Sequence, residues 1–300
     1  MPRVARVKSE EGIYHIMFRS ISEVNLFLDD LDKIKYFKLI YKYQKKFQFK
    51  VYAYCLMDSH GHMIIDCNGA DISKIMHSIN FCYAQYFNRK YNRHGHLFQD
   101  RFKSKIIKDE KYFIVLSAYI HNNPKDLSNY KDRIEEYGFC SLNDYIKGTN
   151  QFEILDTSFL SEILNLDRMK NKKAYIEFVK KCESKDDIID VEFEKVENVY
   201  KSERRIIPRD YTGEQVIEMV AKYFKMEKNR VHVKYKRQYV KLRAISCFLM
   251  SCYCNINQKN ICQLVGNITQ TRVSSLSMIG MEMAFKEKEL LDQFLKIKSA

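Results

Sequence analysis

The sequence lacks any apolar run that approaches the roughly 18 residues a helix needs to cross a membrane. Residues 1–8 also lack the apolar core of a secretory signal peptide. These two absences predict a protein that is neither secreted nor embedded in a membrane. We therefore expect it to be cytoplasmic.

The sequence also lacks a CxxC pair, although it contains 9 cysteines. They are scattered through hydrophobic segments, which predicts free thiols in a reducing compartment rather than a disulfide framework. Cys252, Cys254 and Cys262 lie near one another with His232 upstream, but their spacing fits no common zinc finger. We expect these cysteines to be small buried hydrophobic residues.

The composition allows a sizeable folded protein. The 300 residues, 46% of them hydrophobic, are enough for at least one buried core and favour two domains. The formal net charge of +13 favours an anionic partner.

The stretch 51–67 organises the rest of the chain. It reads as two strands joined at residues 57–59, with His60 and His62 opening the second. Side chains two apart in a strand share a face, so the two imidazoles could bind one metal ion. The alternative is a pair of partly exposed polar residues. A second pair, His94 and His96, lies in a charged turn and is a weaker ligand pair and a candidate DNA contact.

Residues 109–124 predict a helix. Asp109 is a suitable N-cap, and Phe113, Leu116 and Ile120 recur at helical spacing. Pro124 disfavours helical dihedrals at the preceding residue and ends the helix. Tyr119 and Asn123 are four residues apart and therefore lie on one face of this helix.

Five blocks carry a resemblance to a known family. They read YHIMFR at 14–19, LMDSHGH at 56–62, GHLFQDRFKS at 95–104, YIHNNP at 119–124 and SLNDY at 141–145. In order and spacing they resemble the single-tyrosine HUH transposases, specifically the REP-associated tyrosine transposase group. The resemblance covers about residues 10 to 147. It departs from the family at Asp58, where Pro is common, and at Gly61, where a bulky apolar residue is usual.

The resemblance implies a site and a chemistry. His60, His62 and Asn123 match the ligands of a divalent ion, Mg²⁺ or Mn²⁺, and Tyr119 matches the nucleophile that forms a 5′-phosphotyrosine. Tyr112, two turns upstream on roughly the same face, is the rival nucleophile, but no candidate ligand follows it four residues later. The sequence does not identify the general base that takes the proton of the Tyr119 hydroxyl.

The order of elements predicts the fold class. Strand, helix, strand, strand, helix, strand and helix follow one another from residue 12 to 124. This order predicts an α+β fold, a ferredoxin-like split βαβ antiparallel sheet with helices on one face.

Basic and aromatic residues alternate between residues 86 and 108, a mixture that suits phosphates and unpaired bases. The alternative is a solvated basic hairpin whose aromatic residues are core. The candidate DNA-binding side chains are Arg89, Lys90, Arg93, Arg101, Lys103 and Lys105.

Three regions are expected: a catalytic domain over 1–150, a linker with a short helical segment over 151–207, and a helical domain over 208–300. Residues 257–273 have the form of a helix-turn-helix in which Gly266 ends the first helix. The polar residues near the start of the second helix are Gln270, Thr271, Arg272 and Ser275. Residues 213–285 resemble the C-terminal DNA-binding domain of the replication initiator DnaA, which implies duplex DNA binding. A helical interaction module is the alternative.

We therefore expect a metal-dependent transposase that nicks and rejoins single-stranded or hairpin DNA, as a monomer or homodimer, with duplex DNA bound by the C-terminal domain. The alternatives are a non-catalytic DNA-binding regulator with a decayed HUH domain and a replication-initiating nickase.

Overall fold

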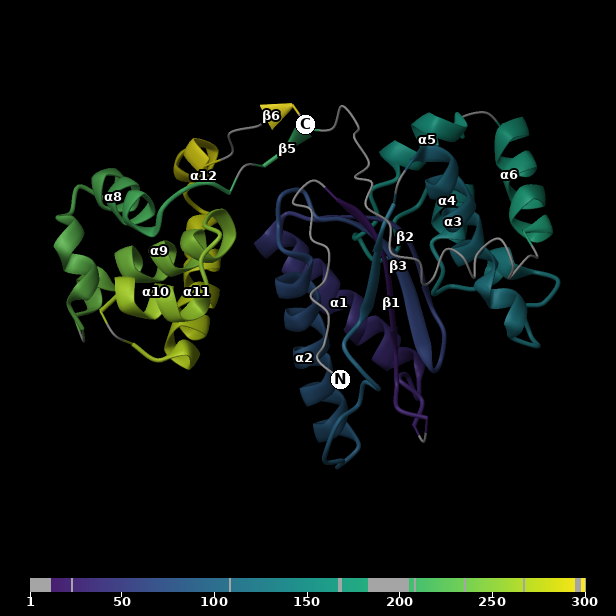
Figure 1. Ribbon diagram of the computed structural model, residues 1–300, viewed down its shortest axis with the longest axis horizontal. Coiled ribbons are helices and arrows are strands. Elements are labelled where there is room, and N and C mark those ends of the chain that lie inside the picture. The colour runs from purple at the N-terminus through teal and green to yellow at the C-terminus, as the bar shows by residue number, and fades with distance from the viewer. Residues whose placement is uncertain are drawn as a thin grey trace. The chain divides into compact units, whose positions relative to one another are not determined.

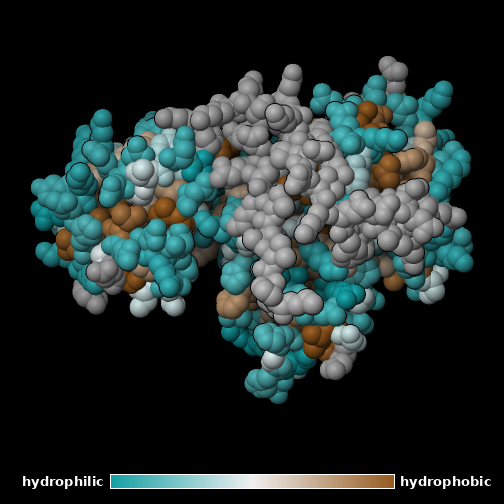
Figure 2. Space-filling model, in the orientation of Figure 1, coloured by the Kyte–Doolittle hydropathy of each residue, from teal (hydrophilic) through white to brown (hydrophobic). Residues whose placement is uncertain are grey.

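The computed structural model describes residues 12–22, 24–107, 109–166, 169–182, 205–207, 209–234, 236–266, 268–294 and 298–299. The chain forms two compact units, Met1–Ser202 and Glu203–Ala300, each with its own hydrophobic core (Figure 1). The faces that Figure 2 shows are largely hydrophilic outside the grey residues.

A four-stranded antiparallel sheet forms the centre of the first unit (Figure 1). Its strands lie in the order β2-β3-β1-β4, and their bounds are β1 Ile13–Arg19, β2 Lys50–Leu56, β3 His60–Asp66 and β4 Lys103–Ile106. Helix α1 (Asp30–Phe47) links β1 to β2, and α2 (Ile72–Lys90) links β3 to β4. This is the split βαβ topology that the element order predicts, and the α+β fold class is confirmed.

Aspartate side chains begin the helices of this unit. Asp29, Asp71 and Asp109 each accept a hydrogen bond from a backbone N–H two or three residues later. They precede α1, α2 and α3 (Glu110–Asn122) as N-caps. Pro124 lies in a 3-10 turn, η1 (Asn123–Asp126), that follows α3 directly. The predicted end of this helix is therefore confirmed.

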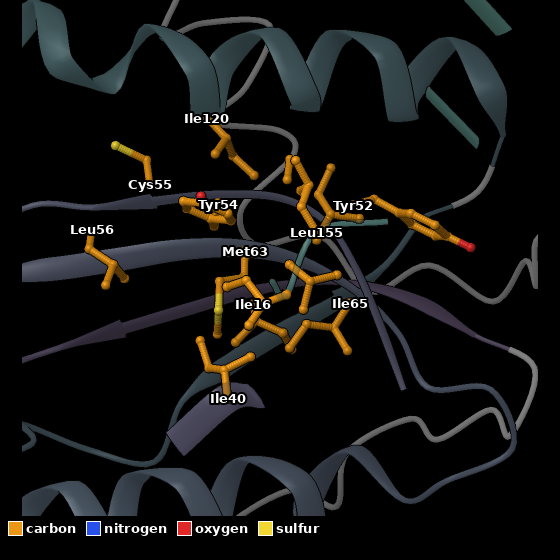
Figure 3. Packing of buried hydrophobic residues seen from close by; sticks show 14 of the residues in the cluster. Ile16, Ile40, Tyr52, Tyr54, Cys55, Leu56, Met63, Ile65, Ile120 and Leu155 are labelled. Carbon is orange, nitrogen blue, oxygen red and sulfur yellow. The ribbon is translucent and has the colours of Figure 1, made fainter. Parts of the chain in front are cut away.

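Helices cover both faces of the sheet, whereas the sequence predicted helices on one face. Helices α1 and α2, the two within the split βαβ unit, share a face: Met63, Ile16 and Ile65 point toward Ile40 of α1 (Figure 3). Ile120 of α3 lies on the opposite side (Figure 3). Every residue of β2 after Lys50 is buried, and a strand buried on both faces requires cover on both.

Residues 151–182 belong to the first unit, although a linker was expected to begin at 151. Helices α4 (Leu142–Lys147), α5 (Ser158–Leu164) and α6 (Met169–Lys181) follow a second 3-10 turn, η2 (Ile134–Glu136). Leu160, Tyr175 and Val179 are buried in the main core. The first unit extends to Ser202.

The second unit is mostly helical, as expected. Its helices are α8 (Gly213–Tyr223), α9 (Val240–Tyr253), α10 (Gln258–Leu264), α11 (Gln270–Ala284) and α12 (Lys288–Phe294), with 3-10 turns η3 (Lys228–His232) and η4 (Arg237–Tyr239). A short antiparallel pair, β5 (Arg205–Ile206) and β6 (Lys298–Ser299), adds to them. Helix α9 is central, with each residue from Leu242 to Met250 buried. Gly280 lets α11 pack closely on α9, because a Cβ there would collide with the Ala244 carbonyl.

No helix among the described residues is long and apolar enough to span a membrane.

Candidate active site

His60 and His62 lie on one face of β3, as the two-residue period requires. Their ring centroids are 5.3 Å apart and nearly perpendicular, at 88°. His62 is 2% exposed, whereas His60 is half-buried and its Nδ1 lies 3.1 Å from the Ser59 hydroxyl. The two rings are therefore close enough to bind one ion.

A third histidine, His15 on β1, joins this face. Its Nε2 lies 3.1 Å from His62 Nδ1, and the two rings stack with centroids 5.3 Å apart. His15 is 4% exposed. No local pattern distinguishes His15, although it stands inside the first of the five blocks. Only the antiparallel register, which pairs Met17 with His62, places His15 diagonally across from His62.

Burial keeps two of these imidazoles neutral. The pKa of His62 lies well below 6.5. The main cause is burial of the ring, and the positive charges of His15 and His60 are secondary causes. Burial, followed by the positive charge of Lys105, lowers the pKa of His15 to about 4. A neutral imidazole has a lone pair available for a metal ion or a hydrogen bond.

Tyr119 reaches the same site from α3. Its ring meets the His62 ring edge-on, with centroids 5.6 Å apart and an interplanar angle of 85°. One turn later Asn123, 8% exposed, donates from Nδ2 to the Tyr119 carbonyl at 2.9 Å. That bond occupies the amide nitrogen and leaves Oδ1 as the atom suited to a cation. Two separate elements, β3 and α3, thus converge on one point.

Tyr112, the rival nucleophile, has different neighbours from those of Tyr119. Tyr112 lies in the first turn of α3, and its ring centroid is 5.6 Å from the Lys105 ammonium. Tyr119 is the tyrosine with a ring contact to His62.

Two imidazole nitrogens and one amide oxygen are donors that a divalent cation could use. His62 uses Nδ1 toward His15, and His60 has Nδ1 near Ser59, so Nε2 of each ring is the nitrogen suited to a metal. Asn123 Oδ1 adds an oxygen. Among the residues that the structure describes, no group of three or more His, Cys, Asp or Glu side chains is arranged to hold a metal ion. His15 directs its Nε2 at His62.

Gly61 and Asp58 are the two departures from the family pattern. At each of them a neighbouring side chain compensates for the residue that is usual in the family. A Cβ on Gly61 would overlap the Phe18 ring, so that ring fills the space of a larger side chain. The Asp58 carboxylate accepts a hydrogen bond from Lys33 Nζ at 2.7 Å. The backbone carbonyl of Asp58 accepts a hydrogen bond from the Phe27 amide at 2.9 Å. The turn that leads into His60 is therefore tied to the α1 side of the unit.

Comparison with known proteins bears on this part of the chain. Residues 8–123 match the family described as "Transposase IS200 like". The matched segment contains His60, His62, Tyr119 and Asn123 and ends before η2, so the second unit lies outside it. The match supports a transposase domain in the N-terminal part.

A solved structure of a REP-associated tyrosine transposase bound to a REP hairpin is similar to the chain at 17% identity and a TM-score of 0.43. The similarity covers 52% of this chain and 93% of that one. No curated protein matches the chain.

The six basic residues proposed as DNA contacts differ in their surroundings. Lys90 is held by Asp29 and Asp32 at 2.7 and 2.8 Å, which makes it a poor phosphate ligand. Arg93 packs over the Phe87 ring. Arg89 and Arg101 are exposed. Lys103 and Lys105 stand opposite Met17 and His15, on the face of the sheet that carries the histidines.

In the second unit, the four polar residues proposed for duplex contact lie exposed in the first turns of α11. Thr269 caps this helix by accepting from the Arg272 amide. Gly266 follows α10 with a φ of +101°, a conformation that glycine adopts without strain. Two helices joined by a tight turn are therefore present. Cys252, Cys254 and Cys262, which lie near them, are buried and form no disulfide with the cysteines that the structure describes.

Proposed function

We propose that the first unit is a transposase that cuts and rejoins single-stranded DNA through Tyr119. The observation that carries this proposal is the edge-on contact between Tyr119 and His62, with Asn123 held to the Tyr119 carbonyl one turn later. Tyr119 and the two imidazoles are thus in ring contact, and Asn123 follows Tyr119 by one turn. The IS200-like match over residues 8–123 supports the same reading.

The reaction follows from these groups. The Tyr119 hydroxyl loses its proton and its oxygen bonds to the scissile phosphorus, while the bond from phosphorus to the 3′-oxygen breaks and the departing 3′-oxygen takes up a proton. A 5′-phosphotyrosine and a free 3′-hydroxyl result. A 3′-hydroxyl that attacks the phosphotyrosine reverses the step and joins two strands without a nucleotide cofactor. We propose that His60, His62 and Asn123 hold Mg²⁺ or Mn²⁺, which when bound polarises the phosphate.

His15 is proposed to be a positioning residue. Binding of a metal through His62 Nε2 requires the proton on Nδ1, and this N–H then donates to His15 Nε2. The bond fixes the tautomer and the ring plane of His62. We propose that Lys103 and Lys105, which lie on the same face, contact phosphates near the cut.

The competing reading of a decayed domain is disfavoured by the fit at Gly61 and Asp58. Phe18 fills the space above Gly61, and Lys33 holds the Asp58 turn, so both departures are compensated. A replication-initiating nickase would use the same chemistry. Transfer of the cut strand to a second DNA end separates a transposase from such a nickase.

For the second unit we propose duplex DNA binding through the start of α11. Its exposed Gln270, Thr271, Arg272 and Ser275 are side chains that can reach base edges and phosphates. The DnaA-like resemblance of residues 213–285 agrees with this role.

The covalent intermediate is the direct test of the first unit. The full chain is incubated with Mn²⁺ and a pool of single-stranded hairpin oligonucleotides, and the products are separated on denaturing gels. We expect a protein–DNA adduct joined through the 5′ side of the cut, with its peptide inside residues 112–125. An adduct mapped to another segment would contradict the proposal, as would cleavage without any adduct.

A further inference from the structure

A large cavity lies beside α2, on the outer side of the turn that precedes β4. Its volume is about 910 Å³, a size typical of sites that bind small organic groups. The polar lining includes Ser73, Lys74, Asn80 and Arg101, and the apolar wall includes Leu97 and Phe102. This cavity is separate from the residues assigned to cleavage.

An exposed aromatic platform forms part of its wall. Phe81 is 53% exposed. The His77 ring, one turn earlier on α2, stacks on it with centroids 5.7 Å apart and an interplanar angle of 21°. Two stacked flat rings at the wall of a cavity suit a third flat ring.

The polar lining suits a nucleobase. Asn80 accepts a hydrogen bond from the Tyr36 hydroxyl at 2.8 Å through Oδ1. That bond orients the side-chain amide and leaves its NH₂ group as a donor, which matches the carbonyl oxygens and ring nitrogens of bases. Ser73 adds a hydroxyl, which can donate or accept.

A second, smaller cavity adjoins this wall and reaches β1 beside His60. Its volume is about 250 Å³, and it shares Gln99, Asp100 and Arg101 with the larger one. Its lining continues to Arg19, which pairs with His60 across β1 and β3, and to Lys103. The two linings together contain four basic side chains, Lys74, Arg101, Arg19 and Lys103, against the single acid Asp100. This charge is complementary to a phosphate backbone.

We propose that the larger cavity binds one unpaired base of the single-stranded DNA that leaves the cleavage site. The strand would pass from His60 over Arg19 and Lys103, and one base would turn into the cavity and stack on Phe81 and His77. The proposal takes only its ligand, single-stranded DNA, from the proposed function. Binding and cleavage can therefore fail separately.

Two single-stranded DNA probes distinguish the contribution of base stacking to affinity from that of phosphate contacts. One is a dT oligomer of about 20 nucleotides, and the other is the same backbone with every base removed. Affinities are measured with the full chain and a chelator, so that no cleavage occurs. Phe81→Ala should weaken dT binding at least about fivefold and leave binding of the abasic strand unchanged, because stacking on one aromatic ring contributes about 1–3 kcal/mol. His77→Ala should weaken dT binding in the same direction, by less.

Phe178→Ala is the matched control, because Phe178 is 41% exposed on α6 and lines neither cavity. It should change neither affinity. Crosslinking with 5-iododeoxyuridine in place of dT should label a peptide that contains Phe81 or His77. Equal dT affinity in wild type and Phe81→Ala would overturn the proposal. So would an equal loss on both strands, or wild-type affinity that does not depend on bases.

Discussion

His15 Nε2 and His62 Nδ1 lie 3.1 Å apart within a buried contact between β1 and β3. The contact links His15 to a side chain that we propose as a metal ligand. Its consequence is testable without measuring catalysis.

His15→Ala should weaken binding of Mn²⁺ about tenfold or more, because loss of an outer hydrogen-bond partner typically costs that much metal affinity. His15→Gln should restore part of the affinity, since the glutamine carbonyl can accept from His62 Nδ1–H. Calorimetric titration of Mn²⁺ gives both values. Unchanged affinity in His15→Ala would show that His15 only fills space, and His94→Ala, in an exposed turn, serves as the control.

Tyr119→Phe should abolish the protein–DNA adduct while DNA affinity and stability change little. The ring and its contact with His62 remain, and only the attacking oxygen is lost. Tyr112→Phe, with its ring beside Lys105, is the matched control and should retain most of the activity. Denaturing gels of both variants give the comparison. An adduct that persists in Tyr119→Phe would assign the nucleophile elsewhere.

Arg272→Ala should weaken binding of duplex DNA, because its side chain is exposed in the first turn of α11. Adduct formation on single strands should stay unchanged, since Arg272 lies in the second unit. Lys286→Ala removes an equal charge from an exposed position just beyond the other end of the same helix. If both variants lose the same duplex affinity, only net charge matters and the start of α11 is not the contact surface.

The first unit should lose stability as the pH falls from about 6.5 toward 3. His121 is fully buried between the Tyr175 hydroxyl, at 2.9 Å, and the Ser141 hydroxyl, at 2.8 Å. Burial lowers the pKa of His121 to about 3, whereas in the unfolded chain it is near 6.5. Between these values the unfolded chain binds a proton that the folded chain does not, so acidification favours unfolding.

The measurement is a series of urea titrations at several pH values in the presence of a chelator. His121→Asn should be less stable at neutral pH, and its stability should vary less with pH, by up to about 1.4 kcal/mol per pH unit. His94→Asn should keep the wild-type dependence. An unchanged slope in His121→Asn would contradict the assignment.

A chain that ends after Cys182 should keep the stability of the first unit, and a chain that ends after Lys147 should not. The shorter one loses Leu160, Tyr175 and Val179 from the core. Each buried side chain of this size contributes about 1.5–3 kcal/mol, so the difference should exceed about 3 kcal/mol. Urea midpoints of the two truncated proteins test this. Equal midpoints would restore the view that the catalytic domain ends near residue 150.

The sequence by itself determined the local elements. Asp71 and Asp109 begin helices because a carboxylate satisfies the free amides of the first turn, and Pro124 ends one because its ring opposes helical geometry. The common face of His60 and His62 follows from the pleat of a single strand. Such features depend on residues only a few positions apart, so they could be read from the chain directly.

Only the tertiary structure decided which elements meet. Tyr119 contacts His62 because α3 covers the face opposite α1 and α2, and no local pattern states which face a helix will cover. His15 and His62 are 47 residues apart in the sequence, and the register of β1 against β3 brings them together. Tyr175 joins the core because its hydroxyl pairs with His121 from a segment whose charge suggested a linker. Contacts between distant residues are selected by the packing of the whole unit, which short-range propensities do not contain.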